Sequence, residues 1–240
     1  MSPHHGACDD GPPALVICAH GTRDPGGRTV VVDAIEAVAA RLPGVTVHAA
    51  YADVHRPRIG EVIAGLPRPV RPPCGQRPST VIVPLLISAG FHVRTDISDA
   101  VSDRPDVHVT APLSPDDRLL DIIDDRLSAR KVPFGATVLL APAGSSDPSA
   151  LANYEHAAQH LAERRGGVVT MAYATGDLGQ AVRRARADGA DHVAVASFLL
   201  APGRIHGKLA ACGADTITDA LLPDARIIDI VLDRYHAALA

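Results

Sequence analysis

Three side chains that can bind a metal or carry a proton directly follow three apolar, strand-like segments. The segments and the side chains after them are 14–19 with His20, 45–52 with Asp53, and 80–87 with His92. In a parallel α/β sheet, ligands bind at the carboxyl ends of the strands. Two imidazoles and a carboxylate suit iron, cobalt, nickel or zinc better than magnesium or calcium, which prefer oxygen ligands. The spacing therefore predicts a site for a divalent transition metal.

The elements that must position these side chains alternate between strands and helices. Residues 29–42 carry apolar side chains at helical spacing, and further helices are expected at about 57–66 and 94–101. A fourth helix is expected after Ser114 as N-cap and Pro115 as first helical residue. This alternation predicts an α/β, doubly wound fold with a mainly parallel sheet of about four strands flanked by helices. The order 2-1-3-4 would bring the three side chains to one rim.

The pattern occurs twice along the chain. Residues 113–127 and 221–235 are identical at eight of fifteen positions. We therefore expect two similar domains related by pseudo-two-fold symmetry, at 12–130 with the metal site and at 134–240 without it. Residues 68–78 have no counterpart in the second copy, and their prolines predict an exposed, mobile insertion.

The second copy serves as an internal control for the site. The positions of His20, Asp53 and His92 are occupied in the second copy by Ala143, Thr175 and Ile205. A single histidine after a strand is more often a solvated or capping residue than a ligand. Because the same scaffold is built without these three side chains, we infer that they serve a function. His206 lies one residue from the register of His92, and its role is left open.

Composition limits the class of protein. The net charge is −4 with scattered basic residues, so neither nucleic acid nor a membrane surface is an expected partner. No apolar run approaches the ~20 residues of a membrane span, and the polar start does not resemble a signal peptide. A cytoplasmic location is expected. The four cysteines lack C-x-x-C spacing, which favours reduced, structural thiols.

Three segments resemble the class II tetrapyrrole chelatases, specifically the two-domain sirohydrochlorin chelatases. The segments are 19–25 (Ala-His-Gly-Thr-Arg-Asp-Pro), 51–57 (Tyr-Ala-Asp-Val-His-Arg-Pro) and 84–97, in which Ser-Ala-Gly-Phe-His at 88–92 is the most specific. The resemblance implies a lyase-type enzyme that inserts Fe²⁺ or Co²⁺ into sirohydrochlorin, without ATP or another nucleotide, for sirohaem or cobalamin biosynthesis. The reaction would take place in a cleft between two α/β domains. The physiological metal is left open among iron, cobalt and nickel.

The resemblance also assigns roles to residues. His20 and His92 match the family's two histidines and are expected to bind the metal and act in catalysis. Asp53 stands where the family usually has glutamate, so direct ligation and proton transfer both remain open for it. Sirohydrochlorin carries eight carboxylates, so cations near the strand ends are expected to bind it. The candidates, each with a solvated surface charge as the alternative, are Arg23, Arg94, Arg204 and Lys208.

The other histidines have no support from the repeat or the motifs and are expected to be structural. They are His4, His5, His48, His55, His108, His156, His160, His192 and His236. The expected partner is a small tetrapyrrole, and the expected state is a monomer or weak homodimer.

The sequence also bears on three other functions. A metal or tetrapyrrole carrier could use the same site without turnover. A histidine phosphatase would need arginine directly before the histidine, and Ala19 stands there. A dinucleotide-binding loop would need G-x-G-x-x-G spacing, which Gly21, Gly26 and Gly27 do not supply.

Overall fold

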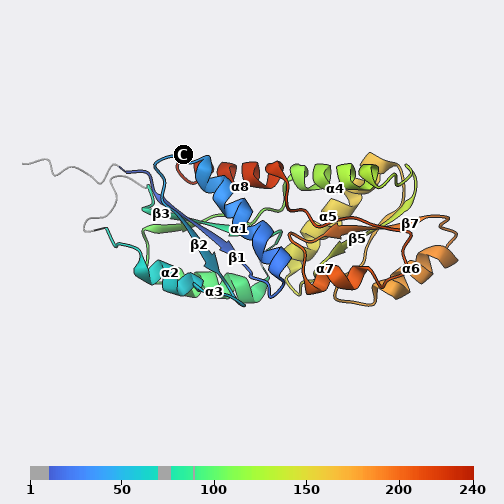
Figure 1. Cartoon of the computed structure of the whole chain (residues 1–240), viewed down its shortest axis with the longest axis horizontal. Helices are drawn as coiled ribbons and strands as arrows, with labels where there is room; N and C mark the ends of the chain where they lie inside the picture. The colour runs from blue at the N-terminus through green and yellow to red at the C-terminus, as the bar shows by residue number, and fades with distance from the viewer. Residues whose placement is uncertain (1–10, 70–76, 89) are drawn as a thin grey trace, which may run out of the picture.

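The chain forms two four-stranded sheets, each flanked by helices (Figure 1). The computed structural model describes residues 11–69, 77–88 and 90–240, without the side chains of Phe91 and His92. The first half contains β1 (Ala14–Ala19), α1 (Pro25–Ala40), β2 (Val47–Tyr51), α2 (Ile59–Gly65), β3 (Thr80–Leu85), α3 (Phe91–Val101), β4 (Val107–Val109) and α4 (Asp117–Ala129). The second half contains β5 (Thr137–Pro142), α5 (Pro148–Arg165), β6 (Val169–Met171), α6 (Leu178–Ala187), β7 (Val193–Phe198), α7 (Arg204–Leu209), β8 (Thr216–Ile217) and α8 (Ala225–Ala237).

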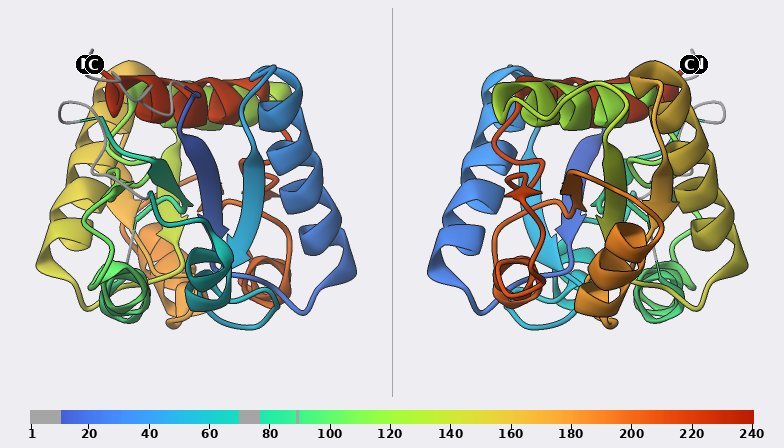
Figure 2. Two further views of the ribbon diagram at one scale, coloured as in Figure 1. Left: turned by 90° about the vertical axis from the view of Figure 1, so that its left-hand side faces the viewer. Right: turned by 90° about the vertical axis from the view of Figure 1, so that its right-hand side faces the viewer.

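The two sheets have the same topology. Their orders are β2-β1-β3-β4 and β6-β5-β7-β8, and every pairing between the named strands is parallel. The order 2-1-3-4, on which the expected rim depended, is the one observed, and the prediction of two similar α/β units is confirmed. The middle strands read as continuous apolar runs because helices cover both faces of each sheet. Helices α8 and α4 lie on one side, and α2, α3, α6 and α7 on the other (Figure 1 and Figure 2).

The start of α4 differs from the sequence-based prediction. Asp116, not Ser114, is the N-cap, and its carboxylate accepts from the amide of Arg118 at 3.1 Å. The amide of Ser114 instead donates to the carbonyl of Ile87 at 2.9 Å, so this segment still follows the sheet where a helix was expected. Pro115 therefore lies before the helix, after a cis peptide bond. The helix α1 also begins earlier than expected, because Asp24 caps it through the amide of Gly27 at 2.7 Å.

The last helix of each sequence copy packs on the sheet of the other copy. Helix α4 contacts β7 and α5, whereas α8 contacts β3 and α1. The hydroxyl of Tyr235 in α8 donates to the carbonyl of Pro13, directly before β1, at 2.6 Å. Residues 12–130 and 134–240 stay our proposal for the two units of the duplication, and helix packing crosses their boundary.

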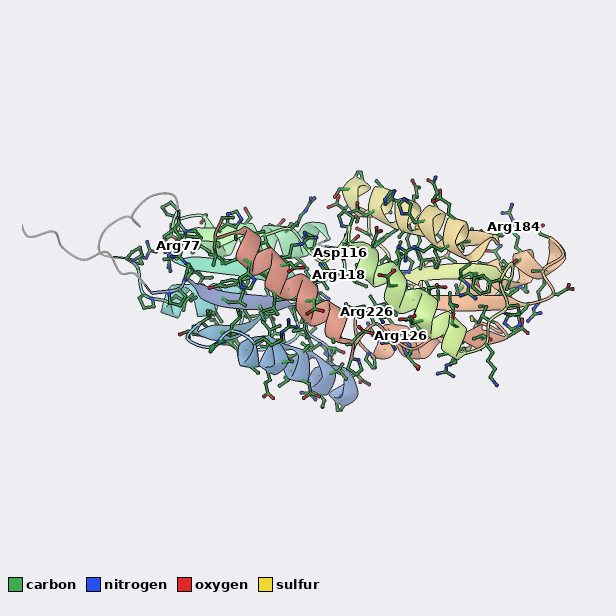
Figure 3. All side chains as sticks on the ribbon, turned by 90° about the horizontal axis from the view of Figure 1, so that it is seen from above. Arg77, Asp116, Arg118, Arg126, Arg184 and Arg226 are labelled. Carbon is green, nitrogen blue, oxygen red and sulfur yellow. The ribbon has the colours of Figure 1, made fainter. Side chains whose placement is uncertain are left out.

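Ion pairs between α4 and α8 follow the pseudo-two-fold. Arg118 binds Asp233 at 2.7 Å, and the repeat-related Arg226 binds Asp125 at 2.7 Å. Figure 3 shows these arginines where the two helices run side by side. Exposed pairs of this kind contribute little stability each. Their reciprocity nevertheless shows that the two copies are arranged by one symmetry.

The apolar core is continuous across the two halves. One cluster contains a face of the first sheet together with α1 and α8. It continues into a face of the second sheet together with α4 and α5. Separate clusters lie under α2 and α3 and around α6 and α7. The shared cluster predicts that the stability of each half depends on the other.

A buried ion pair closes the far end of the first sheet. Arg104 donates to Asp106 through two bonds of 2.9 Å and to the carbonyl of Ile63 in α2 at 2.8 Å. The hydrogen bond from Arg104, helped by the hydroxyl of Ser79, lowers the pKa of Asp106 from 3.8 to about 2 against the opposing effect of burial. Of the insertion expected at 68–78, residues 70–76 lie outside the described part of the chain.

We expect Asp106→Asn to destabilise the protein at neutral pH and to be less harmful in acid. Because the folded-state pKa of Asp106 is depressed, its contribution is complete above the unfolded value of 3.8 and is lost as the pH falls toward about 2. The pH-dependent part should be about 1–2 kcal/mol after solvent screening. Urea unfolding between pH 7 and pH 2 measures it, with Asp99→Asn at an exposed position of α3 as control. A wild-type advantage that does not narrow below pH 4 would contradict this assignment.

Candidate functional site

His20 and Asp53 meet at the carboxyl ends of β1 and β2. Ala19, the last residue of β1, is in register with Tyr51 of β2 and Leu85 of β3. The amide of Asp53 donates to the carbonyl of His20 at 3.1 Å, so the two residues are joined through the backbone. Both side chains are exposed. The structure therefore brings together two of the three residues that the sequence selects.

The position after His20 strongly favours glycine. Gly21 has φ +92°, and an added Cβ would lie 3.2 Å from Cβ of Val54 and 3.3 Å from Cδ2 of His55. The corresponding Gly144 of the second copy has φ +115°. The left-handed turn is therefore part of the duplicated scaffold, and only the first copy adds a histidine to it.

Asp53 has a partner that the sequence did not reveal. Its carboxylate, 63% exposed, pairs with Arg58 at 3.2 Å, and Arg58 also donates to the carbonyl of Ala52 at 2.9 Å. Asp53 and Arg58 are five positions apart around a loop. This spacing matches neither helical nor strand periodicity, so the sequence does not predict the pair. The pair keeps the carboxylate at the rim.

His92 does not directly follow the third strand. Strand β3 ends at Leu85, and His92 is the second residue of α3, whose N-cap is Gly90. The apolar run 80–87 is longer than the strand because Leu86 and Ile87 lead away from it, where their carbonyls accept from the segment before α4. The side chain of His92 lies outside the described part of the chain, so its approach to His20 stays a prediction. Among the described side chains, no group of three or more His, Cys, Asp or Glu is placed to hold a metal ion.

The loop after β1 packs against the second half. An added Cβ at Gly203, which directly precedes α7, would lie 3.2 Å from Oγ1 of Thr22 and 3.8 Å from Cβ of Asp24. Gly27 is buried against the carbonyl of Pro202 in the same loop. The loops at the carboxyl ends of β1 and β7 are therefore in contact, and the candidate residues lie at the junction of the two sheets.

Arg94 links the two halves at this junction. Its guanidinium pairs at 2.5 Å with Asp147, the N-cap of α5, whose side chain is only 3% exposed. The hydroxyl and amide of Ser149, with a smaller effect from Arg94, lower the pKa of Asp147. Asp147 was not among the residues selected from the sequence. Its repeat counterpart Asp24 is also a helix N-cap, and this match was the available signal. Binding of substrate by Arg94 remains a prediction, because this residue already serves the junction.

The other predicted cations are exposed. Arg23 lies in the loop after β1, and Arg204 and Lys208 lie on α7, which follows β7. His206 is half-buried on the same helix, with Nε2 3.3 Å from the carbonyl of Thr218. That contact ties His206 to the segment after β8.

A cavity of about 260 Å³ lies elsewhere, between the start of α4, α5 and Phe198 at the end of β7. Among the site residues whose side chains the structure describes, none lines it. Its wall includes Asp116, labelled in Figure 3, and Asp117. Acidic walls are unfavourable for a substrate that carries carboxylates, so the cavity does not replace the predicted site.

Two parallel sheets of order 2-1-3-4, joined at the loops after their central strands, define a protein of two α/β units. The family model CbiX matches residues 14–130 and 137–238, and the chain therefore belongs to the CbiX family. No curated protein matches it.

Solved structures of chelatases share this fold. SirB from Bacillus subtilis with Fe³⁺ superposes with a TM-score of 0.71 at 18% identity, covering 95% of this chain and 96% of that one. SirB from Bacillus subtilis subspecies spizizenii with cobalt gives 0.68 at 16% identity, covering 95% of each chain. CbiX, described as the terminal enzyme of sirohaem biosynthesis in denitrifying bacteria, gives 0.65 at 17% identity, covering 95% and 100%. At these identities the likeness establishes the fold.

Along the described part of the chain, no helix combines the length and apolar character needed to cross a membrane.

Proposed function

We propose that this protein is a sirohydrochlorin chelatase that inserts Fe²⁺ or Co²⁺ into the macrocycle without ATP, for sirohaem or cobalamin biosynthesis. The observation that carries the proposal is the family match over both halves of the chain. The backbone bond between His20 and Asp53 at the sheet rim supports it, because it joins a nitrogen ligand to a carboxylate at one point.

Insertion requires a metal that is held weakly and two acceptors for the macrocycle's N–H protons. In this proposal the neutral imidazole of His20 replaces water on the incoming metal and releases it to the macrocycle. His92 acts as the second nitrogen ligand. Imidazole titrates near neutral pH, so a histidine can also accept one proton as the metal leaves it. The Asp53 carboxylate, directly or through water, passes the other proton to solvent.

Anaerobic assay of sirohydrochlorin with Fe²⁺ and Co²⁺ in parallel tests the proposal. A chelatase produces the change in the visible spectrum that accompanies metallation, faster than the rate without protein. A metal or tetrapyrrole carrier would bind both components without that change. Absence of turnover with either metal would reject the chelatase.

We also propose that the protein is cytoplasmic and acts as a monomer or weak homodimer. The proposed substrate is a water-soluble polyanion, which fits that location. Sedimentation at several protein concentrations measures the oligomeric state.

We expect Arg204→Ala to raise KM for sirohydrochlorin several-fold with little change in kcat. The exposed guanidinium on α7 would bind a peripheral carboxylate equally in the ground state and the transition state, and loss of such uniform binding raises KM alone. Arg184→Ala on α6 is the matched control, because that arginine is 85% exposed at the far end of the molecule (Figure 3). An unchanged KM would show that the charge of Arg204 is only solvated.

A further inference from the structure

We infer that His55 is a positioning residue that fixes the loop carrying His20. His55 does so by donating a hydrogen bond to the carbonyl of Thr22. The Asp53 side chain therefore does not have to hold this loop. The inference rests on the proposed function, because it assigns His20 to the reaction.

His55 reaches from the loop after β2 to the loop after β1. Its Nε2 is hydrogen-bonded to the carbonyl of Thr22, two residues beyond His20. Its ring stands edge-on to Tyr51, the last residue of β2, with centroids 5.3 Å apart and planes at 78°. Cδ2 of the same ring lies 3.3 Å from where a Cβ of Gly21 would be. One side chain therefore contacts the residue after His20, bonds the next one, and is itself held by the end of β2.

The second copy shows what this loop needs when it carries no histidine. Thr175, at the position of Asp53, donates from Oγ1 to the carbonyl of Ala143, at the position of His20, at 2.6 Å. In the second copy, the side chain at the position of Asp53 therefore holds the loop by its own hydrogen bond. A carboxylate cannot donate such a bond when ionised. In the first copy the carbonyl of His20 accepts from the backbone amide of Asp53. The side-chain bond to the loop comes from His55, which reaches the carbonyl of Thr22, and the carboxylate of Asp53 pairs with the exposed Arg58.

The chemistry of the bond defines the substitutions that test it. A carbonyl oxygen only accepts, so Nε2 of His55 must carry the proton in this contact. The amide group of glutamine can donate to the same carbonyl, whereas alanine cannot. A side chain that orients a metal-binding residue typically changes metal affinity or activity by about 10- to 100-fold when it is removed.

The test compares His55→Ala, His55→Gln and the remote control His108→Ala, which removes an exposed imidazole from β4. We measure Co²⁺ affinity by anaerobic titration, kcat and KM for metal insertion, and thermal unfolding. His55→Ala should lose about 10- to 100-fold in Co²⁺ affinity or in kcat. KM for the macrocycle and the unfolding temperature should change little. His55→Gln should recover to within about threefold of the wild type, because its side-chain amide restores a hydrogen-bond donor to the carbonyl of Thr22.

Two outcomes would overturn the inference. One is wild-type Co²⁺ affinity and kcat in His55→Ala. The other is a His55→Gln variant as impaired as His55→Ala, since the donated bond would then not be the cause. Failure of the proposed function is separate: wild-type protein would insert no metal, while the Co²⁺ titration would still report on the loop.

Discussion

Replacement of His20 or His92 by alanine is expected to abolish metal insertion and to leave the fold intact. Each histidine is proposed to supply a nitrogen ligand to the incoming metal, and loss of one should lower kcat/KM by at least about 100-fold. The fold should survive because the second copy builds the same scaffold with Ala143 and Ile205 at these positions. Anaerobic metallation rates measure the effect, and circular dichroism reports folding.

The control for both variants is His108→Ala, which should metallate at the wild-type rate. Asp53→Ala separates the two roles left open for that carboxylate. A loss as large as that of the histidine variants indicates a ligand, and a smaller loss indicates proton transfer through water. Wild-type rates in both histidine variants would mean that the site lies elsewhere, around His206 and Lys208.

Ile230→Ala in α8 is expected to destabilise the first half of the molecule, although Ile230 lies in the second half of the sequence. Ile230 is fully buried in a helix that packs on β3 and α1. Large-to-small changes at such positions cost about 2–5 kcal/mol. Its repeat counterpart Ile122 in α4 is equally buried, and Ile122→Ala should destabilise the second half by a similar amount. Because one core cluster spans both sheets, we expect a single unfolding transition in both variants.

Urea unfolding measures the loss, and amide hydrogen exchange locates it in β3 for Ile230→Ala and in β7 for Ile122→Ala. Val32→Ala, at a side chain that is 40% exposed on α1, is the control and should change stability by less than about 0.5 kcal/mol. The alternative result is two separate unfolding transitions, with Ile230→Ala affecting only that of the second half of the sequence. It would show that the sequence halves fold independently.

The sequence by itself determined the sheets, the duplication and the rim of the site. Short apolar runs that alternate with amphipathic helices predict parallel strands that are buried on both faces. The match between 113–127 and 221–235 predicts two copies of one unit. Given the order 2-1-3-4, the sequence also predicted that His20 and Asp53 would be neighbours, because strand order fixes which loops adjoin. These features depend on local patterns and on topology, which a sequence carries directly.

Only the tertiary structure decided which sheet each helix covers. The buried faces of α4 and α8 carry large apolar side chains at equivalent positions, and both sheets present apolar strands, so amphipathic spacing fits either arrangement. Each of the two helices covers the sheet of the other copy, and this depends on the path of the chain before the helix. Ser114 follows the sheet by bonding to Ile87, and this contact overrides its local preference to cap a helix.

The partners of the site residues were also decided only in three dimensions. Arg94 and Asp147 come from different halves, and His55 reaches Thr22 across 33 residues. The sequence marks these residues as charged or polar but gives no sign of what they contact. A side chain's partner depends on the packing of loops that share no periodicity, and that packing exists only once both sheets are joined.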